Sequence, residues 1–268
     1  MLRYYNRQNK AKALIKEIFD NDKNILIIHY SCESFYDINN GKTPRITSIA
    51  VKYLDTEIDR SFSIHKIAEI EKIEDITNNY DLIERKMLDE FYEFVKSHEN
   101  YKWLHWNMKN INYGFEAIAH RYRVLGGTPF TMPNEKTINL AKLLYNIYGC
   151  HYIKNPKLYN LIEANNLKHK DLLNGEEEGA AFKDADYVKL HRSTLKKVDA
   201  IYNILDLAYL NELQTDASFV DKNGGKFMLI PYLAKEHCII STILIIIGAI
   251  TSIIEVVKVI IHFFFWCK

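Results

Sequence analysis

Residues 24–30 read NILIIHY, a continuous apolar run with the length of a strand. Such a run is typical of a central strand that is buried on both faces. Two segments with alternating polar and apolar residues follow, RITSIAVKYL at 45–54 and EIDRSFSIH at 57–65, joined by Asp55-Thr56. Alternation indicates half-buried strands. The three segments therefore predict an antiparallel hairpin that extends from the first strand.

The residues after this hairpin are predicted to be mostly helical. Leu88, Phe91 and Val95 recur at helical spacing, and Asp81 is a residue type that caps helices. YKWLHW at 101–106 predicts a fourth strand. The other predicted helices are 10–20, 113–125, 135–148, 157–166 and 191–213. Three antiparallel strands, a helix, a fourth strand and then helices predict an α/β fold with a mixed sheet.

The charges of the 268-residue chain are unevenly placed. Its composition is ordinary for a globular protein, with 48% hydrophobic and 26% charged residues. Residues 238–268 carry only Glu255, Lys258 and Lys268 as charges, which leaves residues 1–237 formally neutral. A neutral body argues against a broad basic surface for nucleic acid, so such a contact has to be a local pocket.

The cysteines and the N-terminus indicate the cellular compartment. The four cysteines are scattered and form no C-x-x-C pair: Cys32, Cys150, Cys238 and Cys267. Neither a zinc site nor a disulfide framework is predicted, and no cofactor is expected. The first 20 residues contain no apolar segment of signal-peptide type. We therefore expect a cytoplasmic domain with reduced thiols.

The C-terminal segment is strongly apolar. Residues 238–254 carry no charge, and the apolar character continues to residue 268. A bilayer core needs about 20 such residues, and a helix of about 30 residues spans about 45 Å. We expect one transmembrane helix at 238–268, a linker at 214–237 and a sensor domain at 1–213. A plain tail anchor and a buried core helix are the simpler alternatives.

Polar and small residues of this segment fall on one heptad seam. A charge in hydrocarbon costs about 2.5–3.5 kcal/mol, so such residues normally face a bundle interior. Glu255 and Lys258 are three residues apart, close enough to pair on one helix face. Small side chains let helices approach closely. The seam predicts a homo-oligomeric bundle whose pore is lined by Ser241, Gly248, Thr251, Glu255, Lys258 and His262.

The order of elements over residues 24–213 resembles that of the DEDDh 3′–5′ exonucleases, which have an RNase H-like fold. Their first strand ends in Asp-x-Glu, where this chain has Ser31-Cys32-Glu33. The stretches that resemble their later motifs are Leu104–Asn107 with Tyr113–Glu116, then Thr137–Leu143, and finally His191–Lys196 for the closing His-x4-Asp. The resemblance implies an RNase H-like mixed sheet flanked by helices.

The departures from this family concern its metal ligands. Such exonucleases hold two divalent ions with four carboxylates. Here Ser31 stands at the first aspartate and Lys196 at the last, and the middle one falls on Asn107, Asn112 or Glu116. A lysine repels Mg²⁺ but offers a phosphate a point charge. The resemblance therefore predicts an exonuclease-like pocket without a metal site.

Such a pocket is expected to bind a single-stranded oligonucleotide or a nucleotide. Aromatic side chains stack on bases, and cations contact phosphates. The predicted ligand-binding residues are Ser31, Glu33, Asn107, Lys109, Tyr113, Phe115, His191, Arg192 and Lys196; Tyr30, Trp106, Arg121 and Lys197 are further candidates. Core packing is the simpler interpretation of each aromatic. The run Glu176–Glu178 is interpreted as a solvated face, or alternatively as a source of replacement metal ligands with Asp184, Asp186 and Asp199.

The combined architecture is similar to bacterial antiphage effectors that permeabilise the inner membrane, most closely the membrane effector of nucleotidyltransferase-linked systems such as Hailong. The resemblance implies an oligonucleotide regulator made by a partner nucleotidyltransferase. It also implies an ion channel in the bacterial inner membrane, gated by a cytoplasmic domain. A tail-anchored, metal-dependent 3′–5′ exonuclease with rearranged ligands is the enzymatic alternative. An adaptor that neither cuts nor conducts is the third.

Overall fold

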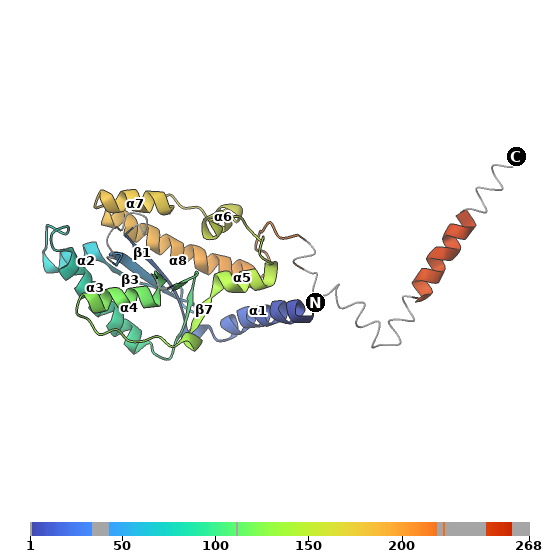
Figure 1. Cartoon of the computed structure of the whole chain (residues 1–268), viewed down its shortest axis with the longest axis horizontal. Helices are drawn as coiled ribbons and strands as arrows, with labels where there is room; N and C mark the ends of the chain where they lie inside the picture. Colours follow the sequence, from blue (N-terminus) through green and yellow to red (C-terminus); the bar gives the residue numbers. More distant parts are fainter. Residues whose placement is uncertain (1, 34–42, 111, 219–221, 223–244, 259–268) are drawn as a thin grey trace.

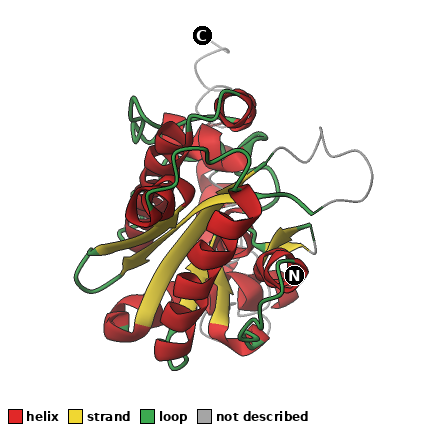
Figure 2. Ribbon diagram, turned by 90° about the vertical axis from the view of Figure 1, so that its left-hand side faces the viewer, coloured by secondary structure: helices red, strands yellow, loops and turns green. Residues whose placement is uncertain are grey.

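The computed structural model describes residues 2–33, 43–110, 112–218, 222 and 245–258 (Figure 1). Most of these residues form an α/β domain in which helices lie on both sides of a central sheet (Figure 2).

Five strands form a mixed sheet in the order β3-β2-β1-β4-β7. They are β1 (Ile25–Cys32), β2 (Ile46–Tyr53), β3 (Asp59–Ser63), β4 (Lys102–His105) and β7 (Thr137–Asn139). β1, β2 and β3 pair antiparallel, whereas β4 is parallel to β1 and β7 is parallel to β4. This arrangement fits the RNase H-like fold, and it confirms the predicted central strand and hairpin. A separate two-stranded sheet pairs β5 (Lys109–Asn110) with β6 (Tyr113–Gly114).

The helices divide between the two faces of the sheet, following the pleat of β1. Ile25 and Ile27 belong to one hydrophobic cluster and Leu26 and Ile28 to the other, because successive side chains of a strand point to opposite faces. The first cluster is completed by α1 (Leu2–Asp20), α5 (Leu140–Tyr148), α6 (Lys157–Ala164) and α8 (Tyr187–Tyr209). The second is completed by α2 (Ile64–Glu71), α3 (Tyr80–Ser97), α4 (Phe115–Val124) and residues of α7 (Gly175–Lys183).

Helix α8 is held along the sheet by polar contacts as well as by its apolar face. Asp186 begins the helix, and its side chain accepts a hydrogen bond from the Lys189 backbone N–H. Near this end, the Ser48 and Thr194 hydroxyls are 2.7 Å apart in a buried hydrogen bond. These contacts fix the N-terminal half of α8 over the carboxyl end of β1, where the polar residues of the strand lie.

Several predicted elements differ from the structure. Residues 135–148 were expected to be one helix, but a 3₁₀ turn at Asn134–Lys136 and strand β7 precede α5. Thr137–Asn139 pairs with β4, and this tertiary pairing overrides the local helical pattern. Helix α1 begins at Leu2 rather than at residue 10, a 3₁₀ turn follows it at Asp22–Asn24, and α2 and α7 were not predicted.

The predicted transmembrane helix is wrong. Among the residues that the structure describes, no helix is both long enough and apolar enough to cross a membrane. The predicted single-pass inner-membrane location is therefore not supported either. Ser241 and His262 lie outside the described residues.

Candidate functional site

The side of β1 that faces α8 changes from apolar to polar along the strand. Ile25 and Ile27 are buried in the core, and His29 and Ser31 follow on the same side at alternate positions. Ser31 is only 3% exposed, yet its hydroxyl requires a hydrogen-bond partner. It finds this partner on α7, across the carboxyl end of the strand.

That partner is the carboxylate of Glu178. Its Oε1 accepts hydrogen bonds from Ser31 Oγ at 3.2 Å and from Ser193 Oγ at 3.3 Å, and it lies 2.7 Å from Lys197 Nζ. The Glu178 and Lys197 side chains are 17% and 12% exposed, so the ion pair is largely shielded from water. We call these four residues (Ser31, Glu178, Ser193 and Lys197) the β1-end cluster.

The start of α7 explains how Glu178 reaches the cluster. The Asn174 side chain accepts hydrogen bonds from the Glu176 and Glu177 backbone N–H groups, and Glu177 Oε2 accepts from the Asn174 backbone N–H. This capping box uses Glu177 and fixes the rotation of the helix. Glu176 and Glu177 are exposed, whereas Glu178 turns inward. The solvated-face interpretation of the acidic run is therefore right for two of its three residues.

Histidine and tyrosine side chains border the cluster. Burial and, secondly, the charge of Lys197 hold the pKa of His29 well below its ordinary value, so the ring is neutral near pH 7. Tyr113 Oη donates to the Tyr30 carbonyl at 3.1 Å, and the two rings stack with centroids 4.5 Å apart. Tyr30 Oη accepts from the Gly114 N–H at 3.0 Å. Gly114 has φ +152°, and a Cβ there would overlap the Met108 carbonyl.

The closing motif is placed differently from the prediction. Lys196 points away from the cluster and pairs with Asp199 at 2.9 Å, and Asp199 also pairs with Lys52 at 3.2 Å. The cation at the end of β1 is its neighbour Lys197. His191 is buried against His65 of α2, with ring centroids 5.0 Å apart. Burial lowers the pKa of His191 to about 3, and Lys66 and His65 add to the shift.

The other predicted residues serve different parts of the domain. Glu33 Oε2 accepts from the Arg45 backbone N–H at 3.4 Å, next to the end of β2. Asn107 bonds to Asn139 between the ends of β4 and β7. Lys109 and Arg192 are exposed. Phe115 packs edge-on against Trp103 and His105, and Trp106 packs against the other core cluster, so core packing is the correct interpretation of both.

Replacement metal ligands were the basis of the exonuclease alternative. In the described part of the chain, no group of three or more His, Cys, Asp or Glu side chains is arranged to hold a metal ion. Asp184 ends α7 and Asp186 caps α8, while Asp199 is engaged with two lysines. The acidic residues near Glu178 thus make separate contacts.

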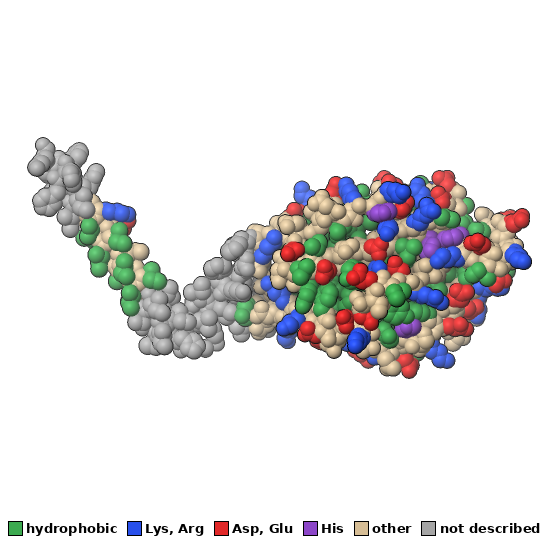
Figure 3. All heavy atoms as spheres, turned by 180° about the vertical axis from the view of Figure 1, so that it is seen from behind, with side chains coloured by type: hydrophobic (Ala, Val, Ile, Leu, Met, Phe, Trp, Pro, Cys, Tyr) green, Lys and Arg blue, Asp and Glu red, His purple; other side chains and the backbone are tan. Residues whose placement is uncertain are grey.

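The described helix at 245–258 carries four of the six predicted seam residues. Lys258 Nζ lies 2.8 Å from Glu255 Oε1, which confirms the predicted pairing of these two charges. The Thr251 hydroxyl donates to the Gly248 carbonyl at 2.9 Å. The helix also carries apolar side chains that are about half exposed or more: Ile245, Ile246, Ile247, Ile250, Ile253, Ile254, Val256 and Val257 (Figure 3).

Comparison with known proteins gives little guidance to function. Neither a family model nor a curated protein matches this chain. Among solved structures it is similar to the family B DNA polymerase from the hyperthermophilic archaeon Pyrobaculum calidifontis, with 14% identity and a TM-score of 0.45. The match covers 78% of this chain and 29% of the polymerase chain, so this chain spans less than a third of that protein's length. At this identity and score, the likeness carries no argument about activity.

Sequence reasoning missed Ser193 and His29 as members or neighbours of the site, and it considered Glu178 only as one residue of the acidic run. One signal was present for Glu178. Asn174 and Glu177 have the spacing of a capping box, which assigns one glutamate of the run to the helix start and turns the next toward α8. For His29, the apolar run at 24–30 suggested only a buried strand.

Proposed function

We propose that the α/β domain binds the end of a single-stranded oligonucleotide, or a nucleotide, at the carboxyl end of β1 and does not cut it with metal ions. The observation that supports this proposal is the Lys197–Glu178 ion pair beside Ser31. The resemblance to DEDDh exonucleases puts a metal-binding carboxylate at Ser31. In this chain Ser31 stands there, and the Glu178 carboxylate beside it is already paired with an ammonium group and two hydroxyl donors.

The β1-end cluster has the chemistry of an anion site that is filled by the protein's own carboxylate. Lys197 Nζ, Ser31 Oγ and Ser193 Oγ all contact Glu178 Oε1. Each of these groups can donate a hydrogen bond to a phosphate oxygen as well as to the carboxylate. The Lys197 side chain is only 12% exposed, and Glu178 occupies the place next to its ammonium group. A phosphate therefore contacts Nζ only after the Glu178 carboxylate has moved away. Ligand binding is therefore an exchange of one anion for another.

The surroundings suit a local contact with one strand end. Acidic and basic side chains are interleaved over the face of the domain in Figure 3, so a long nucleic-acid track is not favoured. Tyr113 is half-buried and already stacks on Tyr30, and a base placed on Tyr113 extends this stack. The site thus offers one phosphate contact and one stacking contact.

The direct test uses the full chain and a fluorescently labelled single-stranded oligonucleotide. We expect Lys197→Ala to weaken binding about tenfold or more in fluorescence anisotropy, because charged hydrogen bonds are worth about 1.5–3 kcal/mol. Lys196→Ala is the matched control and is expected to change affinity little. Incubation with Mg²⁺ or Mn²⁺ is expected to leave the oligonucleotide intact. Equal losses in both variants, or digestion that Lys197→Ala abolishes, would refute the proposal.

A specific observation also favours self-association through the helix at 245–258. We propose that a second copy of this helix covers the seam of Gly248, Thr251, Glu255 and Lys258. Outside this seam the helix is mostly apolar and exposed, and such a surface is normally buried. The paired Glu255 and Lys258 enter an interface as a neutral unit. Small residues at heptad spacing let two helices approach.

The oligomeric state tests this second proposal. A Cβ at Gly248 meets nothing within 4 Å in the single chain, so Gly248→Leu fits the isolated helix but blocks close approach. We expect sedimentation to show an oligomer for the natural chain and a smaller species for Gly248→Leu. Ser252→Leu lies off the seam and serves as the control. A natural chain that sediments as a single subunit would exclude self-association.

A further inference from the structure

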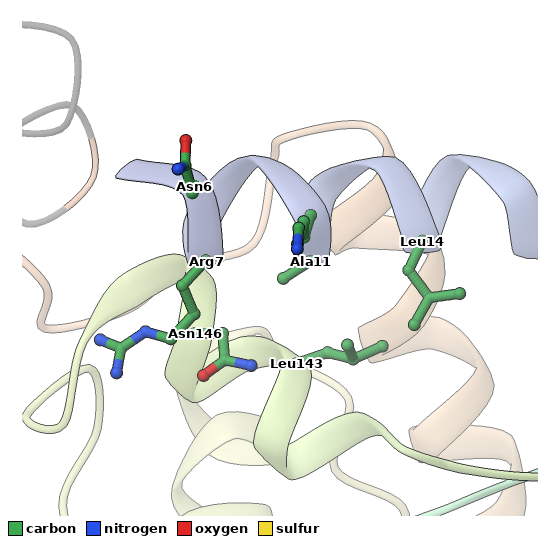
Figure 4. Close-up of a pocket in the computed structure, with 7 residues that line it drawn as sticks. Asn6, Arg7, Ala11, Leu14, Leu143 and Asn146 are labelled. Atoms are coloured by element: carbon green, nitrogen blue, oxygen red, sulfur yellow. The ribbon is translucent and has the colours of Figure 1, made fainter. Parts of the chain in front are cut away.

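A groove between α1 and α5 forms a ligand-sized cavity away from the β1-end cluster (Figure 4). The two helices pack side by side, and Gln8 Nε2 of α1 donates to the Ile147 carbonyl of α5 at 2.7 Å in a buried contact. The cavity beside this contact has a volume of about 490 Å³. Pockets for small molecules have volumes of about 300–1,000 Å³, so the groove is large enough for one.

The groove has an apolar floor and a polar rim. The floor is formed by Ala11 and Leu14 of α1 and Leu143 of α5. The rim carries two amides, Asn6 and Asn146, and two cations, Arg7 and Lys10. In Figure 4, Leu14 and Leu143 lie between the helices, and Arg7 and Asn146 lie at the same end of the groove. A ligand that fits this surface has an apolar body and a polar head at one end.

The charge of the rim indicates an anionic head. The lining contains no acidic side chain. Within α1 the first acidic residue is Glu17, so Lys10 has no carboxylate three or four residues away with which to pair. The Arg7 guanidinium lies over the Tyr145 ring, 5.4 Å from its centroid. An arginine held on a ring keeps its planar N–H donors at its edge, where they suit the oxygens of a phosphate.

We propose that this groove binds a small phosphate monoester with an apolar body. The phosphate contacts Lys10 and Arg7, the amide of Asn146 donates to the same end, and the body covers Leu14 and Leu143. An alkyl phosphate has an apolar chain as its body. A nucleoside monophosphate shares the phosphate monoester and offers the faces of its base as the apolar surface. The site is independent of the β1-end cluster, because α1 and α5 contribute no residue to that cluster.

Titration of the full chain tests the groove with three probes: octyl phosphate, a deoxynucleoside monophosphate and inorganic phosphate. We expect at least one of the two monoesters to bind below about 1 mM in calorimetry, and inorganic phosphate to bind at least tenfold more weakly. Lys10→Glu is expected to weaken monoester binding at least tenfold. Lys10 is exposed, so this substitution leaves the fold intact, which circular dichroism verifies.

Two controls make the result decisive. Lys16→Glu places the same change at an exposed position of α1 outside the groove, and it should leave the dissociation constant unchanged. Lys197→Ala removes the cation of the β1-end cluster and should also leave it unchanged. The groove proposal is refuted if neither monoester binds, if inorganic phosphate binds as tightly, or if Lys16→Glu weakens binding as much as Lys10→Glu. Loss of binding in Lys197→Ala alone would assign the ligand to the other site.

Discussion

Two ion pairs lie on opposite faces of the central sheet and differ in how they are held. On the α3–α4 side, Arg121 makes hydrogen bonds with both oxygens of Glu84 and reaches Asp81 at 2.7 Å. Glu84 is fully buried, and its Oε1 also accepts from the Ile46 backbone N–H at 2.7 Å. On the α8 side, Lys197 meets Glu178 through a single ammonium group, and both side chains keep some exposure.

The difference separates a structural pair from an exchangeable one. The Arg121–Glu84 pair fixes three segments at once, namely α3, α4 and the start of β2. Arg121, a candidate phosphate contact in the sequence, is therefore committed to the fold. Glu178 is surrounded by hydroxyls and one ammonium, and a phosphate satisfies all of them after the carboxylate leaves. Partial exposure supplies the path for that exchange.

Glu84→Ala should show the largest effect. The substitution leaves the Arg121 guanidinium without its main counter-charge, and breaking a buried pair costs about 3–5 kcal/mol. Chemical denaturation should show this loss of unfolding free energy. Glu90→Ala, at an exposed position on the same helix, is the control and should change stability by less than about 0.5 kcal/mol. A small change in unfolding free energy for Glu84→Ala would mean that the Arg121–Glu84 pair is no more important for the fold than the Lys197–Glu178 pair.

Acid should affect the α8 side through the histidine beside it. Because burial and Lys197 depress the pKa of His29, the folded state holds it neutral while the unfolded state protonates near pH 6.5. Its contribution to stability is therefore full above pH 6.5 and falls as the pH drops below that value, by at most about 1.4 kcal/mol per pH unit. His29→Gln should reduce this slope in denaturation curves measured between pH 7 and pH 4.

Other histidines also make the stability depend on pH in this range, so the experiment needs controls. Burial lowers the pKa of His105 and of His191 to about 3, so part of the slope should remain in His29→Gln. The exposed His151 provides the matched variant, and His151→Gln should leave the slope unchanged. An unchanged slope in His29→Gln would show that this ring is solvated and not held beside Lys197.

Asn174→Ala tests how the α7 carboxylate is positioned. Loss of the cap should cost about 1 kcal/mol in unfolding free energy, because two backbone N–H groups of α7 lose their acceptor. Looser positioning of Glu178 should also make oligonucleotide binding easier. Asn24→Ala, at an exposed asparagine outside α7, is the control. If stability falls but affinity does not rise, Glu178 does not compete with the ligand.

Glu178→Gln should destabilise the fold less than Glu84→Ala does, and it should strengthen oligonucleotide binding. Glutamine keeps an acceptor for Ser31 and Ser193 but removes the negative charge opposite Lys197. Oligonucleotide affinity should therefore increase, most strongly at low salt, where charge effects are least screened. Glu176→Gln removes an exposed charge from the same helix and is the control. A decrease in affinity for Glu178→Gln would show that the carboxylate assists binding.

The strand pattern of the sequence was enough to predict the sheet but not all its members. The central strand is buried on both faces, so its sequence at 24–30 is a continuous apolar run that predicts a strand. The alternation of polar and apolar residues identified the hairpin. β7 has only three residues and exists through pairing with β4, which local patterns do not show. The apolar C-terminal segment predicted a membrane span from its hydropathy alone, and no helix among the described residues is long and apolar enough to form one.

The proposed site contains only some of the residues to which the sequence pointed. Ser31 was correctly assigned to the end of the first strand. The His-x4-Asp spacing pointed to Lys196, but α8 turns Lys196 toward Asp199 and its neighbour toward Glu178. One position on a helix corresponds to a rotation of about 100°, so an offset of one residue decides which side chain faces the sheet. Sequence spacing alone does not fix that rotation.

The capping box at the start of α7 has a consequence for how this segment tolerates change. Asn174 sets where the helix starts, and Glu178 follows within the first turn. Inserting or deleting a single residue between them would swing the carboxylate by about 100° around the helix axis, away from Lys197. Substitutions at Glu176 leave that geometry alone. In this turn, the spacing between Asn174 and Glu178 matters more than the identity of Glu176.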